Sequence, residues 1–323
     1  MDAARPTRTA TVVVVPRERF SFACRSLERL LERTPGVALV YVDAGSPPAV
    51  RRYLEARAKV HGFTYVRHER FLSPNASRNL GLRSVRTPYA VFVDNDVIVE
   101  PHWLEPLVAC ADETGAAVVG PLYHIDVGGR VKIHMAGGDA RFENDGDRRT
   151  FVEHHHLGDL PVAAAPQLER RPCDIVEFHT MLVRTSLFER IGPLDEGLRS
   201  IHEHVDLCLL ARDAGCGVYF EPRSVVTYVP ASRLQPSDLA FYMLRWSERW
   251  NRASVARFNE KWRLDARHPT NRKMIVLGRH IRVRGMRLIR ERKTVSRPLW
   301  LRDRVVVLAE KCFNLAYAAV AGI

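Results

Sequence analysis

The chain has 323 residues, of which 46% are hydrophobic and 27% are charged. This composition excludes an intrinsically disordered chain and allows one large buried core or two smaller ones. No window approaches the roughly 20 apolar residues of a membrane-spanning helix, and the run TVVVV at residues 11–15 is too short for the apolar part of a signal peptide, so we expect a cytoplasmic protein.

The net charge of +12 is concentrated in one segment of the chain. Residues 263–311 contain fifteen Lys or Arg and four Asp or Glu, an excess of +11, which leaves residues 1–262 near neutral. We therefore expect a balanced domain at 1–232 followed by a basic region at 233–323. The six cysteines include no CxxC pair, which argues against a zinc ribbon and against a disulfide framework.

The first 120 residues alternate short apolar runs with segments of helical periodicity. This pattern predicts a doubly wound parallel sheet covered by helices. The predicted strands are 11–15, 38–42, 63–66, 89–93 and 116–120.

The chain loses this regularity between residues 121 and 175, where turn residues and charges predominate. We expect an insertion or a long loop there. The predicted order then resumes with a strand at 174–184, a short helix, a helix at 202–215 that ends at Gly215, and two strands at 217–222 and 224–229. From about residue 235 onward the pattern predicts long helices.

Acidic residues follow two of the predicted strands. Asp43 comes after LVYV, and Asp94 comes after AVFV, with Asp96 two positions later. Ligands of open parallel sheets bind beyond the carboxyl ends of the strands, so we expect these acids to share one crevice. Side chains two apart on an extended segment point the same way, so Asp94 and Asp96 can hold Mg²⁺ or Mn²⁺ while Asn95 faces elsewhere. The alternative is that Asp94 and Asn95 only form a turn or cap a helix.

Six motifs follow one another within about residues 10–230: VVVVP, VDAGSP, SPNASRNLGLR, VFVDNDV, MLVRTSLFERIGPLDEGL and HEHVDLCLLARDAG. Together they resemble the family 2 glycosyltransferases of GT-A fold. The resemblance implies an α/β, Rossmann-like and mostly parallel sheet flanked by helices, here with a basic helical C-terminal extension. It also implies a nucleotide-sugar donor, a divalent metal (Mn²⁺ or Mg²⁺) at Asp94 and Asp96, and inversion at the sugar carbon.

The resemblance also implies roles for residues that bind the nucleotide sugar. Pro16 marks the loop that lies against the nucleoside, Asp43 would accept hydrogen bonds from the base or ribose, and Arg78 would reach the base or the diphosphate, beside Asp94. Without the resemblance, a solvated helix charge is the favoured interpretation of Arg78. Ala44 departs from the second acid that commonly follows Asp43 in the family, which leaves the nucleoside open.

The resemblance places the general base at the start of the helix predicted at 202–215. An inverting transfer needs a proton acceptor within reach of the acceptor hydroxyl. The family commonly has a Glu-Asp pair at this point, whereas this chain has Glu203 and His204. A neutral imidazole can serve as a base near pH 7, so we place His204 narrowly ahead of Glu203. Asp206 shares the helix face of Glu203, and all three could instead be helix-start residues without a catalytic role.

Other histidines leave alternatives open. The run EHHHLGD at 153–159, with His154, His155 and His156, could bind a metal, but consecutive side chains rarely converge on one ion, and we interpret it as a charged loop. His179 could contact substrate, act as a third metal ligand, or be a buried histidine bonded to backbone.

The basic tail interleaves cations with apolar side chains. Between residues 272 and 293 these apolar side chains include Ile275, Val276, Ile281, Val283, Met286 and Ile289. Such a helix can lie on an anionic membrane surface, which would make the protein peripheral at the inner face of the cell membrane. Nucleic acid is a competing and less favoured partner for residues 263–311, and a solvated face or packing onto the catalytic domain is a further alternative.

These observations favour a metal-dependent glycosyltransferase that transfers a sugar from a nucleoside diphosphate to a glycan or a lipid-linked acceptor. A nucleotidyltransferase is the alternative enzyme, but that class needs a glycine-rich, Lys-bearing loop after the first strand, and VVVVPRERF has no glycine. A non-catalytic scaffold that keeps the fold and binds membrane or nucleic acid through its basic tail is the alternative outside enzymes. Two retained acids at close range argue against it, because like charges are costly without a cation.

Overall fold

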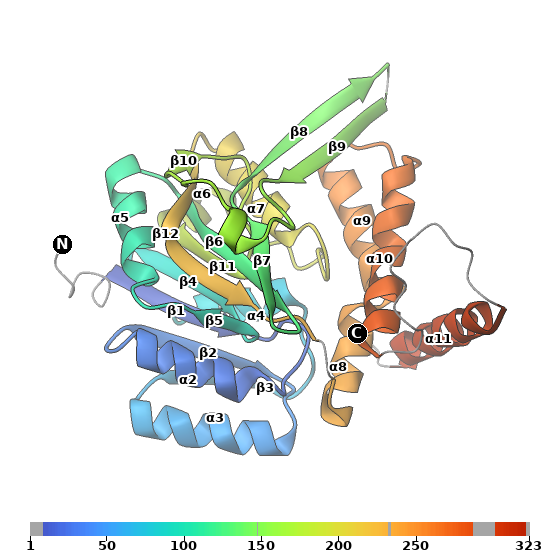
Figure 1. The fold of residues 1–323 in the computed structure, drawn as a ribbon, viewed down its shortest axis with the longest axis horizontal. Helices are drawn as coiled ribbons and strands as arrows, with labels where there is room; N and C mark the ends of the chain where they lie inside the picture. The colour runs from blue at the N-terminus through green and yellow to red at the C-terminus, as the bar shows by residue number, and fades with distance from the viewer. Residues whose placement is uncertain (1–8, 147, 232–233, 287–300, 321–323) are drawn as a thin grey trace.

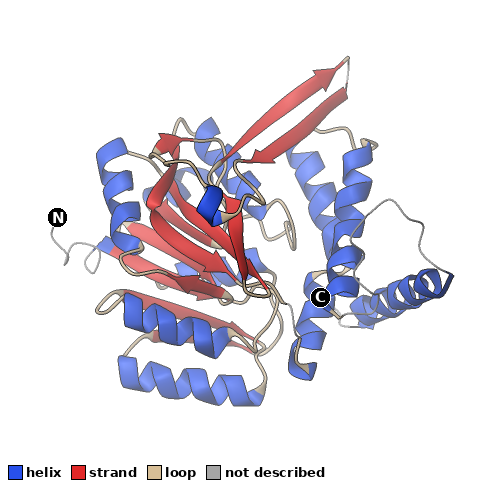
Figure 2. Ribbon diagram, viewed as in Figure 1, coloured by secondary structure: helices blue, strands red, loops and turns tan. Residues whose placement is uncertain are grey.

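The computed structural model describes residues 9–146, 148–231, 234–286 and 301–320, and it is a mixed α/β structure built on one large sheet (Figures 1 and 2). The strand order along the main path of that sheet is β10-β12-β6-β11-β4-β1-β2-β3, while β5 pairs with β12 and β7 pairs with β6. The predicted GT-A type architecture, a mostly parallel sheet flanked by helices, is confirmed.

The first half of the chain forms the parallel part of the sheet. Strand β1 pairs in parallel with β2 and with β4, and β2 pairs in parallel with β3. All six residues of β1 and all six of β4 are buried, because helices or loops cover both faces of these strands. The elements of this half are β1 (Ala10–Val15), α2 (Ala23–Arg33), β2 (Ala38–Ala44), α3 (Pro48–His61), β3 (Thr64–His68), α4 (Pro74–Leu82), β4 (Tyr89–Asp94), β5 (Val97–Val99) and α5 (Leu104–Thr114).

Helix α4 lies unusually close to the sheet, and a glycine makes this possible. A Cβ atom added at Gly81 would stand 2.5 Å from Val13 Cγ1 and 2.9 Å from Val42 Cγ2. Any side chain here would push the helix away from β1 and β2. This close packing fixes the position of α4 relative to β1 and β2. It therefore also fixes where Arg78, which α4 carries, lies relative to the ends of these strands.

The second half of the chain completes the sheet with antiparallel and parallel strands. Strand β11 is antiparallel to both β4 and β6, and β12 is parallel to β6. The two strands predicted at 217–222 and 224–229 are one strand, β12, with a register shift between Glu221 and Val225. The elements are β6 (Val118–Val127), β7 (Arg130–Met135), β8 (Gly138–Asp145), β9 (Arg148–His155), η1 (Val162–Ala164), β10 (Arg171–Pro172), β11 (Thr180–Arg184), α6 (Ser186–Ile191), α7 (Glu203–Asp213) and β12 (Val218–Tyr228).

The expectation of a long loop at 121–175 is wrong. Strand β6 continues to Val127 and β7 returns along it, and β8 and β9 then form a separate two-stranded hairpin that projects from the domain (Figure 1). Within the hairpin, Ala140 is buried and Phe142 and Phe151 pack against a cluster that contains Phe258 and Trp262, so its apolar face is short and lies among charged residues that hide the alternation. The strand predicted at 174–184 begins only at Thr180.

The C-terminal region is helical, as predicted, and packs against the rest of the protein. Trp262 of α9 lies 5.6 Å from the ring of Phe142 on β8, and Trp246 donates a hydrogen bond to Glu18, which follows β1. The elements are η2 (Pro236–Asp238), α8 (Leu239–Arg245), α9 (Glu248–Trp262), α10 (Pro269–Gly285) and α11 (Leu301–Val320).

Helix α10 carries part of the basic tail and is not a free amphipathic helix. Arg282 is buried and forms an ion pair with Glu310 of α11, and Ile281 packs against a cluster that contains Tyr242 and Trp246. Packing onto the rest of the protein, one of the alternatives given for the basic tail, therefore accounts for the side of α10 that carries Ile281 and Arg282. Ile289, also assigned to the amphipathic segment, lies outside the described residues. Within the described residues, no helix is long and apolar enough to span a membrane.

Candidate active site

Asp94, Asp96 and His179 converge at the carboxyl end of β4. Each offers one ligand atom, these atoms lie within 4.8 Å of one another, and all three side chains are buried. Asn95 points elsewhere, since it accepts a hydrogen bond from the backbone N–H of Arg17 (3.1 Å) and donates one to the carbonyl of Arg19 (2.8 Å). Asn95 and Asp96 form a turn between β4 and β5, so the two carboxylates meet through this turn and not through the alternation expected of an extended segment.

Asp96 differs from Asp94 in having no hydrogen-bond partner among the described residues. Both of its carboxylate oxygens are buried and lack a hydrogen-bond partner among the described residues. Burial, and then the nearby charge of Glu18, raise the pKa of Asp96 well above its usual range. Buried carboxylates in folded proteins normally have partners, so this site favours a cation that would supply one.

Asp94, in contrast, is fully paired. Its Oδ1 accepts a hydrogen bond from Arg78 (2.9 Å) and its Oδ2 accepts one from Arg17 (3.2 Å). Burial alone would raise the pKa of Asp94, but His179, Arg78 and Arg17 together lower it to about 2. Asp94 is therefore ionised at any physiological pH.

His179 precedes β11 and completes the donor set. Its Nδ1 lies 3.4 Å from Asp94 Oδ2, and its Nε2 lies 3.3 Å from Glu177 Oε2. Burial, and then the charge of Arg17, lower its pKa to about 4, so the ring is neutral and has a free lone pair at neutral pH. Neither ring nitrogen has a hydrogen-bond partner among the described groups, so the alternative of a buried histidine bonded to backbone is wrong.

Arg78 is not the solvated helix charge that the sequence left open. Its side chain is buried, its guanidinium lies 3.8 Å from the ring centroid of Phe178, and it bonds Asp94. Helix α4 is capped at its N-terminus by Ser73, and the start of its second turn presents Arg78 to the end of β4. Desolvation lowers the pKa of Arg78, while the neighbouring Asp94 carboxylate favours the positively charged guanidinium.

Asp43 and Pro16 lie at the same edge of the sheet but outside the cavity described next. Asp43 accepts hydrogen bonds from Ser46, from the Tyr65 hydroxyl (2.6 Å) and from Arg67 (2.8 Å), so its oxygens already have partners. Pro16 is buried directly after β1. Their roles toward a nucleoside stay predictions.

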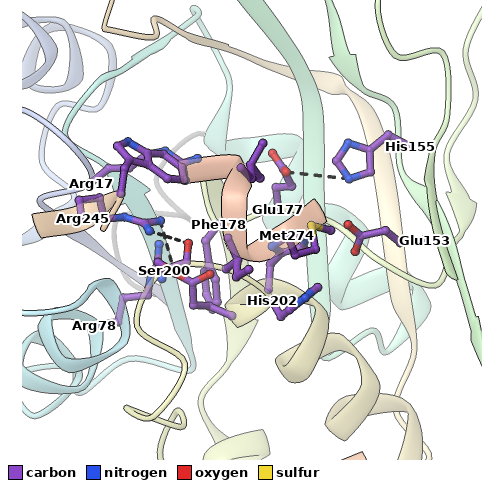
Figure 3. A pocket seen from close by; sticks show the side chains of 15 residues that line it. Arg17, Arg78, Glu153, His155, Glu177, Phe178, Ser200, His202, Arg245 and Met274 are labelled. Carbon is purple, nitrogen blue, oxygen red and sulfur yellow. Dashed lines mark hydrogen bonds and ion pairs between the residues drawn. The ribbon is translucent and has the colours of Figure 1, made fainter. Parts of the chain in front are cut away.

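A cavity of about 170 Å³ opens beside the Asp94 cluster. Arg17, Arg78 and Arg245 lie on one side of it, and Glu153, His155 and Glu177 lie on the other (Figure 3). Its wall includes side chains of α8 and α10, so the C-terminal helices take part in the site. The remaining lining residues are Phe178, Ser200, Ile201, His202, Glu203, His204, Trp246, Met274 and Leu277.

The three residues proposed for the base separate into two groups. Glu203 and His204, at the start of α7, both line the cavity. His204 is partly exposed, its Nε2 is buried without a partner, and burial lowers its pKa, so it is a neutral acceptor. Asp206 is not among the described residues that line the cavity. It accepts hydrogen bonds from Lys261 (2.7 Å) and Trp262 (2.9 Å) and so joins α7 to α9.

The sequence did not lead us to predict several residues of the site. Arg17 could have been found, because it directly follows β1 in VVVVPRERF, at the edge where ligands bind. Glu177 and Arg245 could not, since their positions depend on a loop and on the packing of α8. The interpretation of 153–159 as a loop is wrong for its first residues, because His154 and His155 belong to β9.

Comparisons with known proteins agree with this architecture. The chain is 28% identical over 239 residues to the pre-mycofactocin glycosyltransferase of Mycobacterium tuberculosis, an alignment that covers 73% of this chain and 46% of that protein. It is 25% identical over 229 residues to an uncharacterized protein of Sinorhizobium fredii, with 67% of this chain and 24% of that protein covered. The chain thus spans less than half the length of the curated relatives it matches.

A solved structure shares the fold. The crystal structure of GalNAc-T7 with UDP, GalNAc and Mn²⁺ aligns with a TM-score of 0.55 and 18% sequence identity, covering 80% of this chain and 55% of that one. The family model described as glycosyl transferase family 2 matches residues 11–191, which is more than half of the chain. On these grounds the chain belongs to glycosyl transferase family 2.

Proposed function

We propose that this protein is a divalent-metal-dependent, inverting glycosyltransferase that transfers a sugar from a nucleoside-diphosphate sugar to a hydroxyl of a glycan or lipid-linked acceptor. The observation that carries the proposal is the convergence of Asp94, Asp96 and His179, with the Asp96 carboxylate buried and unpaired. Family membership and the relatives' names support the reaction class.

The donor set fits a divalent cation. Two carboxylates and a neutral imidazole suit Mn²⁺, and the carboxylates alone suit Mg²⁺. Asp94, Asp96 and His179 would hold the ion, which when bound would stabilise the charge that develops on the departing diphosphate. A bound ion would also give Asp96 the partner that it lacks.

Arg17 and Arg78 are placed to hold the diphosphate. Both guanidinium groups line the cavity and both contact Asp94, so they are preorganised beside the metal ligands. Arg17 is the less buried of the two, with 18% of its side chain exposed against 2% for Arg78. We therefore assign contact with the phosphates chiefly to Arg17 and the orientation of Asp94 to Arg78.

His204 or Glu203 would remove the proton from the acceptor hydroxyl. Both line the cavity that the arginines line, and His204 has an unpartnered Nε2 and a lowered pKa. Glu203 is paired with Arg245 at 3.5 Å, and this contact would hold the Glu203 carboxylate in place. These contacts keep His204 ahead of Glu203 as the proposed base.

The test is a thermal-shift screen of nucleoside diphosphates and nucleotide sugars, each with Mn²⁺ and with a chelator. A ligand at 100 times its Kd stabilises the native state by about 2.7 kcal/mol. We expect one nucleotide series to raise Tm in Mn²⁺ and not in chelator, and slow metal-dependent hydrolysis of the matching nucleotide sugar without acceptor. Metal-dependent binding without hydrolysis or transfer would favour the scaffold alternative, and the absence of any nucleotide binding would refute the proposal.

We also propose that the basic region 263–311 associates with an anionic membrane surface, where a lipid-linked acceptor would lie. Helix α11 supports this, because it exposes large apolar side chains beside the cations of α10: Val305, Leu308, Phe313, Leu315 and Val320. Their exposed fractions range from 45% to 87%. Cations near anionic lipid and apolar side chains in the headgroup boundary both stabilise such an association.

A further inference from the structure

We propose that His134, His155 and Glu177 form a second metal site, suited to Zn²⁺ and separate from the cluster of Asp94, Asp96 and His179. The three residues come from β7, from β9 and from the segment before β11. The proposal does not depend on the transfer reaction, because it concerns other ligands and a different class of metal.

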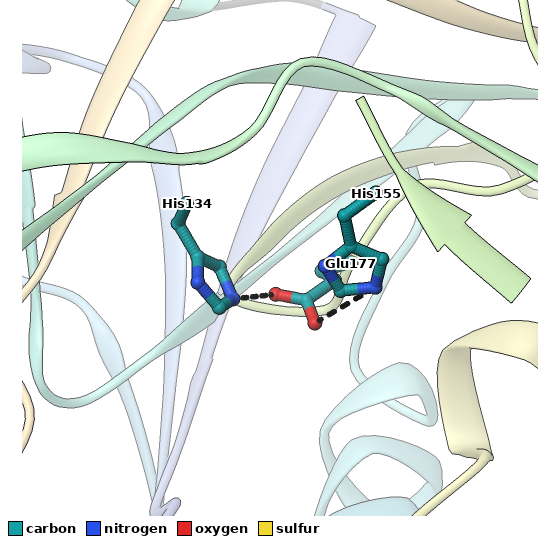
Figure 4. Close-up of side chains that lie close together, drawn as sticks. All are labelled: His134, His155 and Glu177. Atoms are coloured by element: carbon teal, nitrogen blue, oxygen red, sulfur yellow. Dashed lines mark hydrogen bonds and ion pairs between the residues drawn. The ribbon is translucent and has the colours of Figure 1, made fainter. Parts of the chain in front are cut away.

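The geometry brings three ligand atoms together. One atom from each residue lies within 4.8 Å of the others. His134 Nε2 is 2.8 Å from Glu177 Oε2, and His155 Nε2 is 4.0 Å from Glu177 Oε1, so the carboxylate lies between the two rings (Figure 4). The rings meet edge to face at a centroid distance of 5.8 Å, which turns both Nε2 atoms toward the carboxylate.

An ion pair between His134 and Glu177 alone does not explain this arrangement. A proton on His134 accounts for the 2.8 Å contact, but His155 stands too far from Glu177 for a hydrogen bond and still faces it. His154, the next residue on β9, is exposed and points to the opposite face. A shared cation would account for His155, because metal ligands are held about 3 Å or more apart by the ion between them, and the 2.8 Å contact of His134 would lengthen slightly when the ion binds.

The ligand types indicate which metal the site prefers. Two imidazoles and one carboxylate suit Zn²⁺ and similar transition metals, whereas Mg²⁺ prefers oxygen ligands. Three protein ligands leave a fourth position, and the exposure of His155 and Glu177 to the cavity directs that position into it. Glu153 lies two residues before His155 on the same face of β9 and has a buried, unpartnered Oε2 that faces the cavity.

Glu177 would also connect the two metal sites. Its Oε2 lies 3.3 Å from His179 Nε2, on the opposite side of that ring from Asp94. A carboxylate in this position orients a metal-binding histidine. An ion on Glu177 would therefore fix the orientation of His179 from one side while its Nδ1 remains free on the other.

The experiment measures zinc in tag-free protein that carries Asp96→Asn, which removes one ligand of the first site. The chain is stripped with chelator, equilibrated with Zn²⁺ and passed over a desalting column, and bound metal is counted by mass spectrometry. We expect one Zn²⁺ per chain. Adding His155→Gln should weaken binding at least about 10-fold, since loss of even an outer-shell partner costs about 10–100-fold. His154→Gln is the matched control on the same strand and should leave binding unchanged.

A crystal of the unsubstituted protein soaked in Zn²⁺ provides a second readout that does not depend on any variant folding. Anomalous scattering at the zinc edge should give a peak between His134, His155 and Glu177. No zinc in the Asp96→Asn chain, equal loss of zinc in His154→Gln and His155→Gln, or the absence of an anomalous peak between His134, His155 and Glu177 would overturn the proposal. None of these results depends on whether sugar transfer occurs, so the second site and the proposed function fail separately.

Discussion

Asp96→Asn should stabilise the protein without metal and abolish its response to metal. In the native state the Asp96 carboxylate is fully buried and neither oxygen has a hydrogen-bond partner. An unsatisfied buried polar group costs about 1–3 kcal/mol, and more when it is charged. Asparagine has nearly the same shape and leaves a polar group unpaired too, but it carries no charge. In chelator, at a pH above the native pKa of Asp96, the variant should therefore gain about 1.4 kcal/mol for each unit by which that native pKa exceeds its unfolded value. At about 2–4 °C per kcal/mol, or slightly less for a chain of this length, the change is measurable by calorimetry.

The pH dependence of this effect follows from the raised pKa of Asp96. The native state binds its proton more tightly than the unfolded chain does, so the unsubstituted protein loses stability as pH rises from about 4 toward the native pKa. The gain of the variant should therefore be small near pH 4 and largest above the native pKa. In Mn²⁺ at 100 times its Kd the unsubstituted protein gains about 2.7 kcal/mol and the variant should gain almost none.

Asp43→Asn is the matched control for this prediction. Asp43 is as buried as Asp96, but its oxygens accept hydrogen bonds from Ser46, Tyr65 and Arg67. Its loss should destabilise the protein by about 1.5–3 kcal/mol in chelator and leave the Mn²⁺ response intact. A destabilised Asp96→Asn protein in chelator, together with an unchanged response to Mn²⁺, would refute the reasoning that Asp96 awaits a cation.

Three further predictions concern the cavity, α7 and the tail. His204→Ala and Glu203→Gln should each lower turnover, and the substitution of the true base should lower it by about 10²–10⁴-fold. Donor binding in Mn²⁺, measured by calorimetric titration, should stay nearly intact. Near-normal transfer by both variants would remove this helix from the mechanism. Asp206→Asn should lower the free energy of unfolding by about 1–3 kcal/mol through its bonds to α9, with no change in Mn²⁺ affinity. Liposome flotation should retain the protein on vesicles with anionic lipid and not on neutral ones, and equal behaviour would contradict the role assigned to residues 263–311.

The parallel half of the fold could be predicted from the sequence because its strands are covered on both faces. The predicted strands at 11–15, 38–42 and 89–93 differ from β1, β2 and β4 by at most two residues at either end. Continuous apolar runs of this kind have few other stable arrangements. The β8–β9 hairpin was missed because its buried face is short: Ala140, Phe142 and Phe151 stand among charged and turn residues that mask the alternation.

The candidate site also has a part that local sequence predicts and a part that depends on tertiary packing. Asp94 and Asp96 could be placed together because they flank one residue at a strand end, although a turn and not the alternation of an extended segment brings their side chains together. The partners that decide their charge come from elsewhere, Arg17 from a loop and His179 from a segment 85 residues further along the chain. His134, His155 and Glu177 meet only through tertiary packing, and no local pattern could have indicated that three elements bring them together.

The C-terminal helices supply partners for buried carboxylates of the preceding region. These contacts bear on whether residues 1–232, the predicted catalytic domain, can fold alone. Glu18 accepts a hydrogen bond from Trp246, Glu203 pairs with Arg245, and Asp206 accepts bonds from Lys261 and Trp262. A chain cut at residue 232 would leave three carboxylates that lose these partners, and each loss of a partner to a buried charge costs several kcal/mol. That sum is comparable to the 5–15 kcal/mol by which a typical domain is stable. We therefore expect the fragment 1–232 to be largely unfolded at 25 °C by circular dichroism, and a cooperative, native-like unfolding transition in that fragment would show that the two regions are independent domains.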